Sequence, residues 1–201
     1  KSGYGCFGAD LKKNEWSKAV DKLTAIVDLT DKGQVLKRLP RKIDCIIHLA
    51  ANARVYDLVV NPSMARDNFE MTFNVMEFAR LNRVKKFIFA SSREVYGNAG
   101  KTKYSEKDSQ IQNCESPYNA SKMGGEALAW AYQRCFGVDF IIFRFSNVYG
   151  KYDNSERLVP VSIRNAAKNK DLVVFGGDKV LDFTYIDDVT DGILLSLQKF
   201  D

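Results

Sequence analysis

Residues 43–51 read IDCIIHLAA, which is a nearly continuous apolar run. Such a run, without polar alternation, is typical of a strand that is buried on both faces of a parallel sheet. Three further strands are predicted around it, over 23–29 (LTAIVDL), 85–91 (KKFIFAS) and 138–145 (VDFIIFRF).

Two amphipathic segments separate these strands. Residues 62–82 place apolar side chains at helical spacing, and Pro62 suits a first helical turn. Residues 117–136 form the second predicted helix, with Gly137 as its stop. Strands that alternate with helices are joined by right-handed crossovers into a parallel sheet with helices on both faces. The predicted fold class is therefore α/β, a Rossmann-like doubly wound parallel sheet.

The rhythm changes after Gly150. A helix is predicted over 157–168 and another over 187–200, with short strands over 171–175 and 182–186. We therefore expect a main domain over residues 1–150 and part of a smaller lobe over residues 151–201.

Composition excludes several classes of protein. The 201 residues carry a net charge of +5, but the basic residues are dispersed, so no nucleic-acid partner is expected. No apolar run reaches the roughly 20 residues that cross a bilayer, and the N-terminus lacks the apolar region of a signal peptide, so no membrane partner is expected. The four cysteines form no CxxC pair, which favours neither zinc nor disulfides. We expect no metal and a cytoplasmic protein with reduced thiols.

Polar and small residues follow the predicted strands, at the edge where open parallel sheets bind their ligands. Ala50, Ala51 and Ser91 would let a flat cofactor approach the backbone. His48 lies within a buried strand, and we interpret it as a core residue with satisfied hydrogen bonds. Asp187 and Asp188 are interpreted as caps of the last helix.

Tyr118 and Lys122 share one face of the helix at 117–136, one turn apart. A tyrosine, with a pKa of about 10, becomes a base near neutral pH only if its phenolate is stabilised. The ammonium of Lys122 supplies part of that stabilisation. Ser92, at a neighbouring strand end, can bridge a substrate hydroxyl and the tyrosine oxygen.

With these motifs in this order, the sequence resembles the extended short-chain dehydrogenase/reductase family, in its NAD-dependent epimerase/dehydratase branch. The matching stretches are collinear between about residues 23 and 200: VDLTD (27–31), IIHLAANARV (46–55), DNFEMTFNVMEFAR (67–80), KKFIFASSREVYG (85–97), SPYNASKMGGE (116–126), FRFSNVYG (143–150) and FGGDKVLDFTYIDDV (175–189). The resemblance implies that residues 1–150 are an NAD-binding domain and residues 151–201 part of a substrate-binding lobe.

The resemblance also implies roles for individual residues. Ser92, Tyr118 and Lys122 match the catalytic serine or threonine, tyrosine and lysine. Glu94 either acts on the substrate or only holds the loop at 93–116. The implied cofactor-binding residues are Asp28, Leu29, Leu49, Ala50, Ala51, Asn68, Ser91, Tyr118 and Lys122. The implied substrate-binding residues are Ser92, Asn147, Arg157 and Phe175, and Arg54 is a weaker candidate.

The implied reaction is a transient oxidation at C4 of a nucleotide sugar, with a UDP-sugar favoured. Dehydratases of the family carry Asp-Glu after the catalytic serine, where this sequence has Arg93-Glu94. A 4-epimerase is therefore the leading hypothesis. A dehydratase, decarboxylase or reductase of the same family remains an alternative, as does a non-catalytic relative or an inactive piece. Helices 62–82 and 117–136 match those that pair in homodimers of the family, so a homodimer is expected.

Two departures from the family pattern matter. The first strand and glycine loop are expected to be missing, because the GxGxxG at residues 3–8 follows no predicted strand and lies too close to VDLTD to leave room for the usual second strand. We read this motif as an ordinary glycine-rich loop rather than a remnant of the phosphate loop, and we expect the chain alone to bind NAD poorly. Leu181 stands where the family usually has a phosphate-binding arginine, so Arg144, Arg157 or Lys179 takes its place or none is needed.

Overall fold

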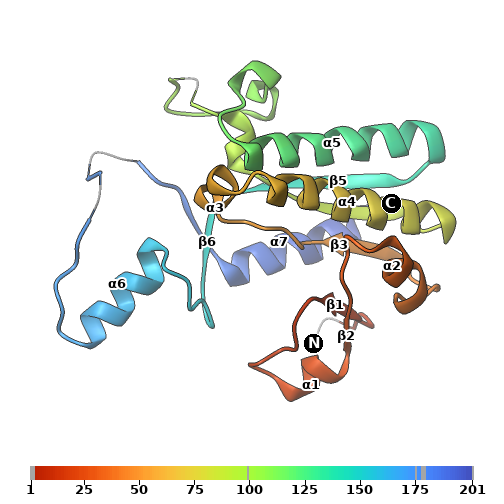
Figure 1. Cartoon of the computed structure of the whole chain (residues 1–201), viewed down its shortest axis with the longest axis horizontal. Helices are drawn as coiled ribbons and strands as arrows, with labels where there is room; N and C mark the ends of the chain where they lie inside the picture. The colour runs from red at the N-terminus through yellow and green to blue at the C-terminus, as the bar shows by residue number, and fades with distance from the viewer. Residues whose placement is uncertain (1–2, 99, 175, 178–179, 201) are drawn as a thin grey trace. The chain divides into compact units, whose positions relative to one another are not determined.

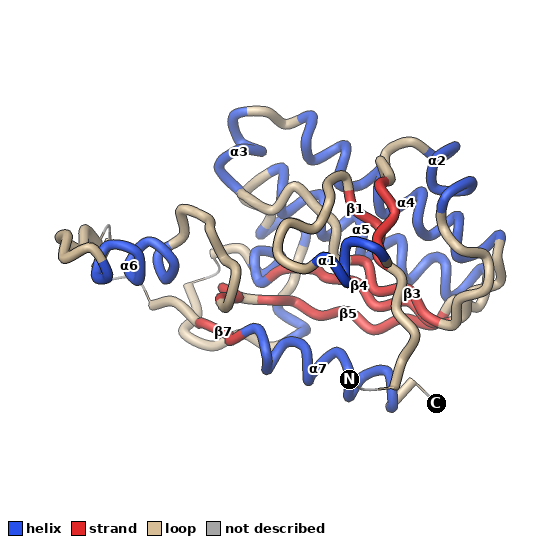
Figure 2. The backbone as a smooth tube through the Cα atoms, turned by 90° about the horizontal axis from the view of Figure 1, so that it is seen from below, coloured by secondary structure: helices blue, strands red, loops and turns tan. Residues whose placement is uncertain are grey.

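The predicted central strands form a three-stranded sheet in a computed structural model that describes residues 3–98, 100–174, 176–177 and 180–200. The strands are β3 (Cys45–His48), β4 (Lys86–Ser92) and β5 (Asp139–Phe145), hydrogen-bonded in the order β3-β4-β5. Strands β3 and β4 are parallel, with Cys45 opposite Lys86 and His48 opposite Phe89. Figure 2 shows the three strands lying side by side. The carboxyl ends of β3 and β4 therefore meet at one edge, as the sequence predicts.

Two long helices, α4 (Ser63–Leu81) and α5 (Pro117–Phe136), pack against each other and on this sheet (Figure 1). Helix α5 begins where Ser116 accepts a hydrogen bond from the Asn119 N–H, and it ends at Gly137, whose φ of 63° suits the left-handed cap. Buried side chains from α4, β4 and α5 form the main core, among them Met76, Phe78, Phe87, Phe89 and Ala129.

Adjacent glycines in α5 permit this close packing. A Cβ on Gly125 would lie 2.3 Å from Cζ of Phe89, and one on Gly124 would lie 2.9 Å from Cδ2 of Phe69. Glycine in a helix interior costs about 1 kcal/mol relative to alanine. Here the two glycines let α5 lie close to β4 and α4, where a larger residue would collide with Phe89 or Phe69.

A second, two-stranded parallel sheet precedes the central one. It pairs β1 (Gly8–Asp10) with β2 (Thr24–Ile26), and α1 (Lys18–Lys22) connects them. Strand β1 was not predicted; it begins at Gly8, the last glycine of the motif, and therefore overlaps the motif. The expectation that the motif leaves no room for the usual second strand before VDLTD stays a prediction. A Cβ on Gly8 would lie 2.7 Å from Oγ1 of Thr24, so glycine allows the two strands to approach.

Shorter elements complete this part of the chain. Helix α2 (Lys32–Arg38) follows β2 and is capped by Asp31, which accepts from the Gln34 N–H. Helix α3 (Val55–Val60) precedes α4. The predicted loop at 93–116 holds three short 3-10 turns, η1 (Arg93–Tyr96), η2 (Glu106–Asp108) and η3 (Ile111–Asn113).

The chain divides into two compact units, residues 1–144 and 145–201. The second unit contains β6 (Asn147–Tyr149), α6 (Leu158–Ala167), β7 (Phe183–Tyr185) and α7 (Ile186–Gln198), with β6 and β7 parallel. Residues 171–174 form no strand, contrary to the prediction. Helix α7 is preceded by Tyr185 without a side-chain cap, so Asp187 and Asp188 lie in its first turn rather than capping it. The predicted domain division at residue 150 stays a prediction.

Candidate functional site

Lys122 is buried in α5, one turn after Tyr118, which is also buried. Its Nζ donates a hydrogen bond of 2.7 Å to the Ala90 carbonyl in β4. The same nitrogen lies 5.8 Å from the centroid of the Tyr118 ring and 5.2 Å from that of Phe89. Burial lowers the pKa of Lys122 from 10.5 to about 8, because the charged form is poorly solvated there. A buried cation therefore lies beside the predicted catalytic tyrosine.

Ser92 is the last residue of β4 and caps η1, where its Oγ accepts the Glu94 N–H at 3.2 Å. The turn that it opens is attached to α5, because Asn119 Nδ2 donates to the Glu94 carbonyl at 2.6 Å. Asn119 directly follows Tyr118. The structure thus holds the Ser92–Glu94 turn against the helix that carries Tyr118 and Lys122.

The Glu94 carboxylate pairs with Arg93 at 3.2 Å, and both side chains are partly exposed. Such a pair contributes little to stability. It leaves Glu94 accessible, so its action on a substrate stays a prediction.

Asn68 holds the loop after β3. Its Oδ1 accepts the Asn52 N–H at 2.7 Å, and its Nδ2 donates to the Asn52 carbonyl at 3.0 Å and to Ser121 Oγ at 3.3 Å. Asn52 Nδ2 in turn donates to the Met64 carbonyl. Directly before this loop, Leu49 is 57% exposed, while Ala50 and Ala51 are half-buried. The backbone at the end of β3 is therefore open beside a loop with a fixed conformation.

Asp28 and Leu29 follow β2 and differ in their surroundings. Asp28 Oδ1 accepts from the Thr30 N–H and hydroxyl at 2.9 and 2.7 Å. Leu29 belongs to the core, and its carbonyl accepts from Asn74 Nδ2 at 3.0 Å. Their predicted contact with the cofactor would therefore involve a half-buried carboxylate and a backbone that Asn74 already holds.

Ser91 lies beside a different group of residues. Its hydroxyl donates to Glu126 Oε1 at 2.5 Å, and Glu126 forms a two-point ion pair with Arg144, at 2.9 and 2.7 Å. These contacts engage Arg144 within the first unit, which argues against it as a substitute for the missing phosphate-binding arginine. Sequence reasoning missed Glu126, Asn119 and Asn52. Glu126 could have been suspected, since it lies four residues after Lys122 on the same helix face.

The remaining candidates lie in the second unit. Asn147 Nδ2 donates to the Asp182 carbonyl at 2.9 Å, Arg157 is the N-cap residue of α6, and Phe175 lies outside the described residues. A cavity of about 160 Å³ in this unit is lined by Tyr149, Gly150, Asp153, Val159, Pro160, Ile163 and Arg164. It includes Val159 and Pro160, which lie just after Arg157, a predicted substrate-binding residue.

His48 is a core residue, as expected. Nε2 lies 3.2 Å from Thr72 Oγ1, and the ring stacks on Phe89 at 6.0 Å between centroids. Burial, with the charge of Lys122 adding to it, lowers the pKa of His48 to about 3. His48 is therefore neutral at physiological pH.

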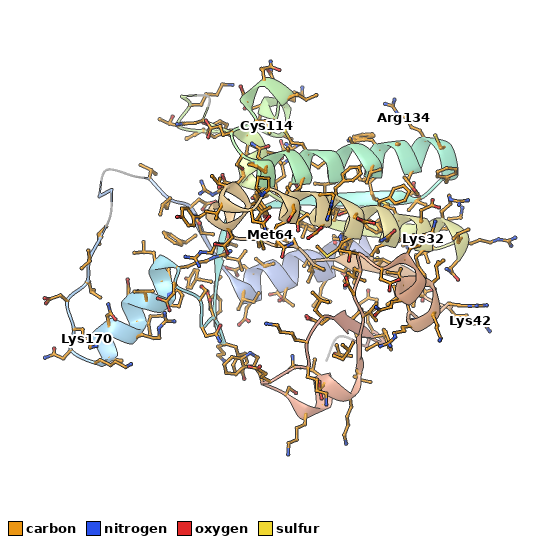
Figure 3. The ribbon with its side chains drawn as sticks, in the orientation of Figure 1. Lys32, Lys42, Met64, Cys114, Arg134 and Lys170 are labelled. Atoms are coloured by element: carbon orange, nitrogen blue, oxygen red, sulfur yellow. The ribbon has the colours of Figure 1, made fainter. Side chains whose placement is uncertain are left out.

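Basic side chains also lie far from this site. Lys42 and Arg134, labelled in Figure 3, are exposed and project from separate parts of the first unit. Among the described residues, no group of acidic, histidine and cysteine side chains could hold a metal ion. Within the same residues, every helix is too short or too polar to cross a membrane.

The sequence model of the NAD dependent epimerase/dehydratase family matches residues 1–201. The chain belongs to this family. It is 33% identical over 193 residues to the UDP-glucuronate 4-epimerase of Thermodesulfobacterium geofontis. The matched region covers 94% of this chain and 57% of that relative. It is 35% identical over 192 residues to an uncharacterized protein of Methanocaldococcus jannaschii, with 94% and 59% covered.

Solved structures of family members share the fold. A UDP-glucose 4-epimerase of Thermotoga maritima with UDP-glucose matches with a TM-score of 0.85 at 26% identity, over 97% of this chain and 66% of that one. A dTDP-glucose 4,6-dehydratase of Streptomyces venezuelae, a double mutant with NAD bound, matches with a TM-score of 0.78 at 31% identity, over 87% and 54%. The chain spans a little over half the length of the curated relatives quoted above. The predicted family and the Rossmann-like α/β class are thus confirmed.

Proposed function

We propose that the protein is an NAD-dependent nucleotide-sugar 4-epimerase that acts on a UDP-sugar through a transient 4-keto sugar. The observation that carries this proposal is the buried Lys122 ammonium beside Tyr118, with the Ser92 turn tied to the same helix through Asn119 and Glu94. This arrangement serves proton transfer at a hydroxyl group next to a hydride acceptor.

Lys122 also fits the cofactor. An ammonium has three N–H donors, and among the described residues its hydrogen-bond partner is the Ala90 carbonyl. Donors therefore remain for a ribose hydroxyl. Asp28, Leu29, Leu49, Ala50, Ala51, Asn68 and Ser91 are the other residues proposed to hold NAD, around the open backbone at the end of β3. When bound there, NAD would supply the acceptor, and afterwards the donor, of the hydride at the sugar carbon.

Tyr118 would take the proton of the sugar 4-hydroxyl. The nearby charge of Lys122 favours the phenolate over the phenol, so the proton transfer becomes easier near neutral pH. The Ser92 oxygen accepts the Glu94 N–H, which leaves the hydroxyl proton of Ser92 available. That proton can bridge the substrate oxygen and the Tyr118 oxygen.

Arg93 supports an epimerase over a dehydratase, because it stands where dehydratases of the family carry the acid that protonates the leaving hydroxyl. Its ion pair with Glu94 keeps a cation at that position. A dehydratase remains the second candidate, since a relative of 31% identity whose structure matches this chain is named a dTDP-glucose 4,6-dehydratase.

Interconversion of UDP-glucose and UDP-galactose by the purified protein, in the length that its gene encodes, tests the proposal. Chromatography of the sugar nucleotides should show both from either one, and Tyr118→Phe should abolish the exchange. Dehydration of dTDP-glucose without interconversion of the UDP-sugars would establish the second candidate instead. Binding of NAD without turnover of any nucleotide sugar would point to a non-catalytic relative.

We also propose that Asn147, Arg157, Phe175 and the cavity beside α6 bind the nucleotide of the substrate. Val159 and Pro160 give the cavity an apolar lining, and Arg164 adds a cation. Pro160→Trp should fill the cavity and raise KM for the sugar nucleotide while NAD affinity stays unchanged. A rise in KM for dTDP-glucose alone would assign the cavity to a different nucleotide.

A cytoplasmic homodimer is proposed as the working form. The four cysteines are free thiols, in keeping with a reducing compartment. On α4, Phe69 and Phe73 lie one turn apart and are 41% and 37% exposed. A partner's helices would bury both rings, so Phe73→Glu should convert the dimer to a monomer in sedimentation. A wild-type protein that sediments as a monomer would refute this part.

A further inference from the structure

A largely buried ion pair joins α5 to β5. Arg144 Nε donates to Glu126 Oε1 at 2.9 Å, and Nη2 donates to Oε2 at 2.7 Å. This two-point geometry is the strongest that an arginine and a carboxylate make. Charges at such depth are stable only where further hydrogen bonds satisfy them.

Those further contacts lead to the candidate site. The Ser91 hydroxyl donates to Glu126 Oε1 at 2.5 Å. On the other side, Arg144 Nη1 donates to the Glu106 carbonyl at 2.7 Å, and the guanidinium lies 5.0 Å from the centroid of the Tyr96 ring. The pair therefore contacts the end of β4 and two points of the segment 93–113.

Three of these residues lie close in sequence to residues of the proposed chemistry. Ser91 precedes Ser92, Tyr96 ends the turn η1 that contains Glu94, and Glu126 follows Lys122 by one helical turn. Tyr96 also stacks on Tyr104 at 5.4 Å, so Arg144 supports a pair of rings rather than one side chain.

We infer that Glu126 and Arg144 are positioning residues, which hold the Ser92–Tyr96 turn in register with Tyr118 and Lys122. This inference rests on the proposed function. Neither residue needs to touch the substrate: the three nitrogens of Arg144 are already engaged inside the first unit. A misplacement of 1 Å at a reacting group can cost about 100-fold in rate. Loosening of this ion pair should therefore lower kcat more than it weakens binding.

The same unit contains a matched control. Arg80 forms a two-point ion pair with Glu77 at 2.8 and 3.0 Å, the Tyr132 hydroxyl donates to Glu77 at 2.7 Å, and Arg80 lies 5.2 Å from the Phe136 ring. This second pair has the same chemical groups as the first: a carboxylate, a guanidinium bonded to it at two points, a hydroxyl donor and an aromatic ring. None of its members contacts the segment 93–113 in the described structure.

The experiment compares Arg144→Lys and Glu126→Gln with Arg80→Lys and Glu77→Gln in the purified protein as its gene encodes it. Lysine keeps the positive charge but cannot form the two parallel hydrogen bonds that a guanidinium makes with a carboxylate. We expect kcat to fall about 10- to 100-fold in the first two variants, with KM and the Kd for NAD within about threefold of wild type. Hydrogen–deuterium exchange without ligands should be faster in residues 93–113. The control variants should lower the melting temperature and leave kcat and that exchange unchanged.

Several outcomes would overturn the inference. Equal losses of kcat in both pairs would show that Arg144 acts through stability alone. A higher KM with unchanged kcat would place Arg144 at the substrate. Unchanged exchange in 93–113 would show that the pair does not hold this segment. If Arg144→Lys does not fold, Tyr96→Leu must reproduce the faster exchange and the lower kcat.

The exchange measurement uses no substrate, so its result is independent of the proposed activity. If the wild type turns over another nucleotide sugar in place of the UDP-sugars, the proposed epimerase is wrong, and the same variants are compared with that sugar. A slow Arg144→Lys variant would then still support the positioning role.

Discussion

Gly125→Ala should destabilise the protein, although alanine is the better helix former. The new Cβ would lie 2.3 Å from Cζ and 2.8 Å from Cε1 of Phe89. Carbon atoms in contact prefer separations of about 3.5–4.0 Å, so the ring must move by about an ångström or more. Phe89 is 1% exposed and lies in the main core, which leaves it no open space. Overpacking of this kind costs about 1–3 kcal/mol.

Gly124→Ala provides the matched control on the same helix. Its Cβ would meet Cδ2 and Cε2 of Phe69 at 2.9 and 3.0 Å, but this ring is 41% exposed in the single chain and can move into solvent there. Both alanine variants are therefore compared in the Phe73→Glu background, in which the proposed dimer is broken. Both substitutions gain the same helix propensity, about 1 kcal/mol over glycine. The difference between the two variants therefore isolates the collision with Phe89. We expect Gly125→Ala to be less stable than Gly124→Ala by about 1–3 kcal/mol.

Urea denaturation followed by circular dichroism measures this difference. Only the Gly125 variant should also lose activity, because Phe89 lies beneath the Lys122 ammonium, 5.2 Å from its centroid. Phe89→Leu should partly restore the stability of Gly125→Ala, giving a favourable coupling energy in the double-mutant cycle. Equal stability of the two alanine variants, or no coupling with Phe89→Leu, would refute the packing argument.

Three further substitutions test Tyr118, Lys122 and the buried His48. Tyr118→Phe should lower kcat by at least about 100-fold, because the general base is lost; substantial residual turnover would contradict the proposed role. Lys122→Met tests the buried cation. Burial lowers the pKa of Lys122 from 10.5 to about 8, so between these pH values the unfolded chain binds more protons than the folded one. The stability of the wild type should therefore rise with pH across that range. The variant should lack this gain, and parallel stability curves from pH 8 to 10.5 would argue against it. His48→Gln tests the acidic pH range. Because the pKa of His48 is lowered from 6.5 to about 3, the wild type should lose stability as the pH falls through this range, and the variant should not. Coinciding curves of stability against pH for the two proteins would contradict a neutral buried histidine.

Helix α5 shows how well local signals can predict an element. Its predicted bounds of 117–136 are those of the structure, because Ser116, Pro117 and Gly137 mark its ends by local chemistry. Strand β2 was predicted over 23–29 but spans Thr24–Ile26. Asp28 turns its carboxylate to the Thr30 N–H and hydroxyl, so the chain leaves the ladder although Val27 and Leu29 stay buried. Apolar patterning marks burial, whereas the end of a strand depends on such local hydrogen bonds.

Missed elements and missed site residues have different causes. Helix α2 carried a readable signal, with Asp31 as its cap and Lys37 and Arg38 in its last turn. In contrast, the partners of Ser91 could not be read from sequence. Its hydroxyl contacts Glu126, which lies 35 residues away, and Arg144 is a further 18 residues along the chain. Such pairing is set by how α5 and β5 pack beside β4, and no local pattern encodes it.

Two kinds of buried charge distinguish structural from chemical residues in this site. Glu126 and Arg144 form two hydrogen bonds with each other, and each has a further hydrogen-bond partner. Both charges are therefore already paired within the first unit. Lys122 donates a hydrogen bond to the neutral carbonyl of Ala90, and its pKa near 8 corresponds to a burial cost of about 3 kcal/mol. A fold that only required stability would gain by an apolar residue at that position. We therefore propose that the buried Lys122 cation, with donors to spare beside Tyr118, serves proton transfer at that residue, and that the Glu126–Arg144 pair holds its neighbours in place.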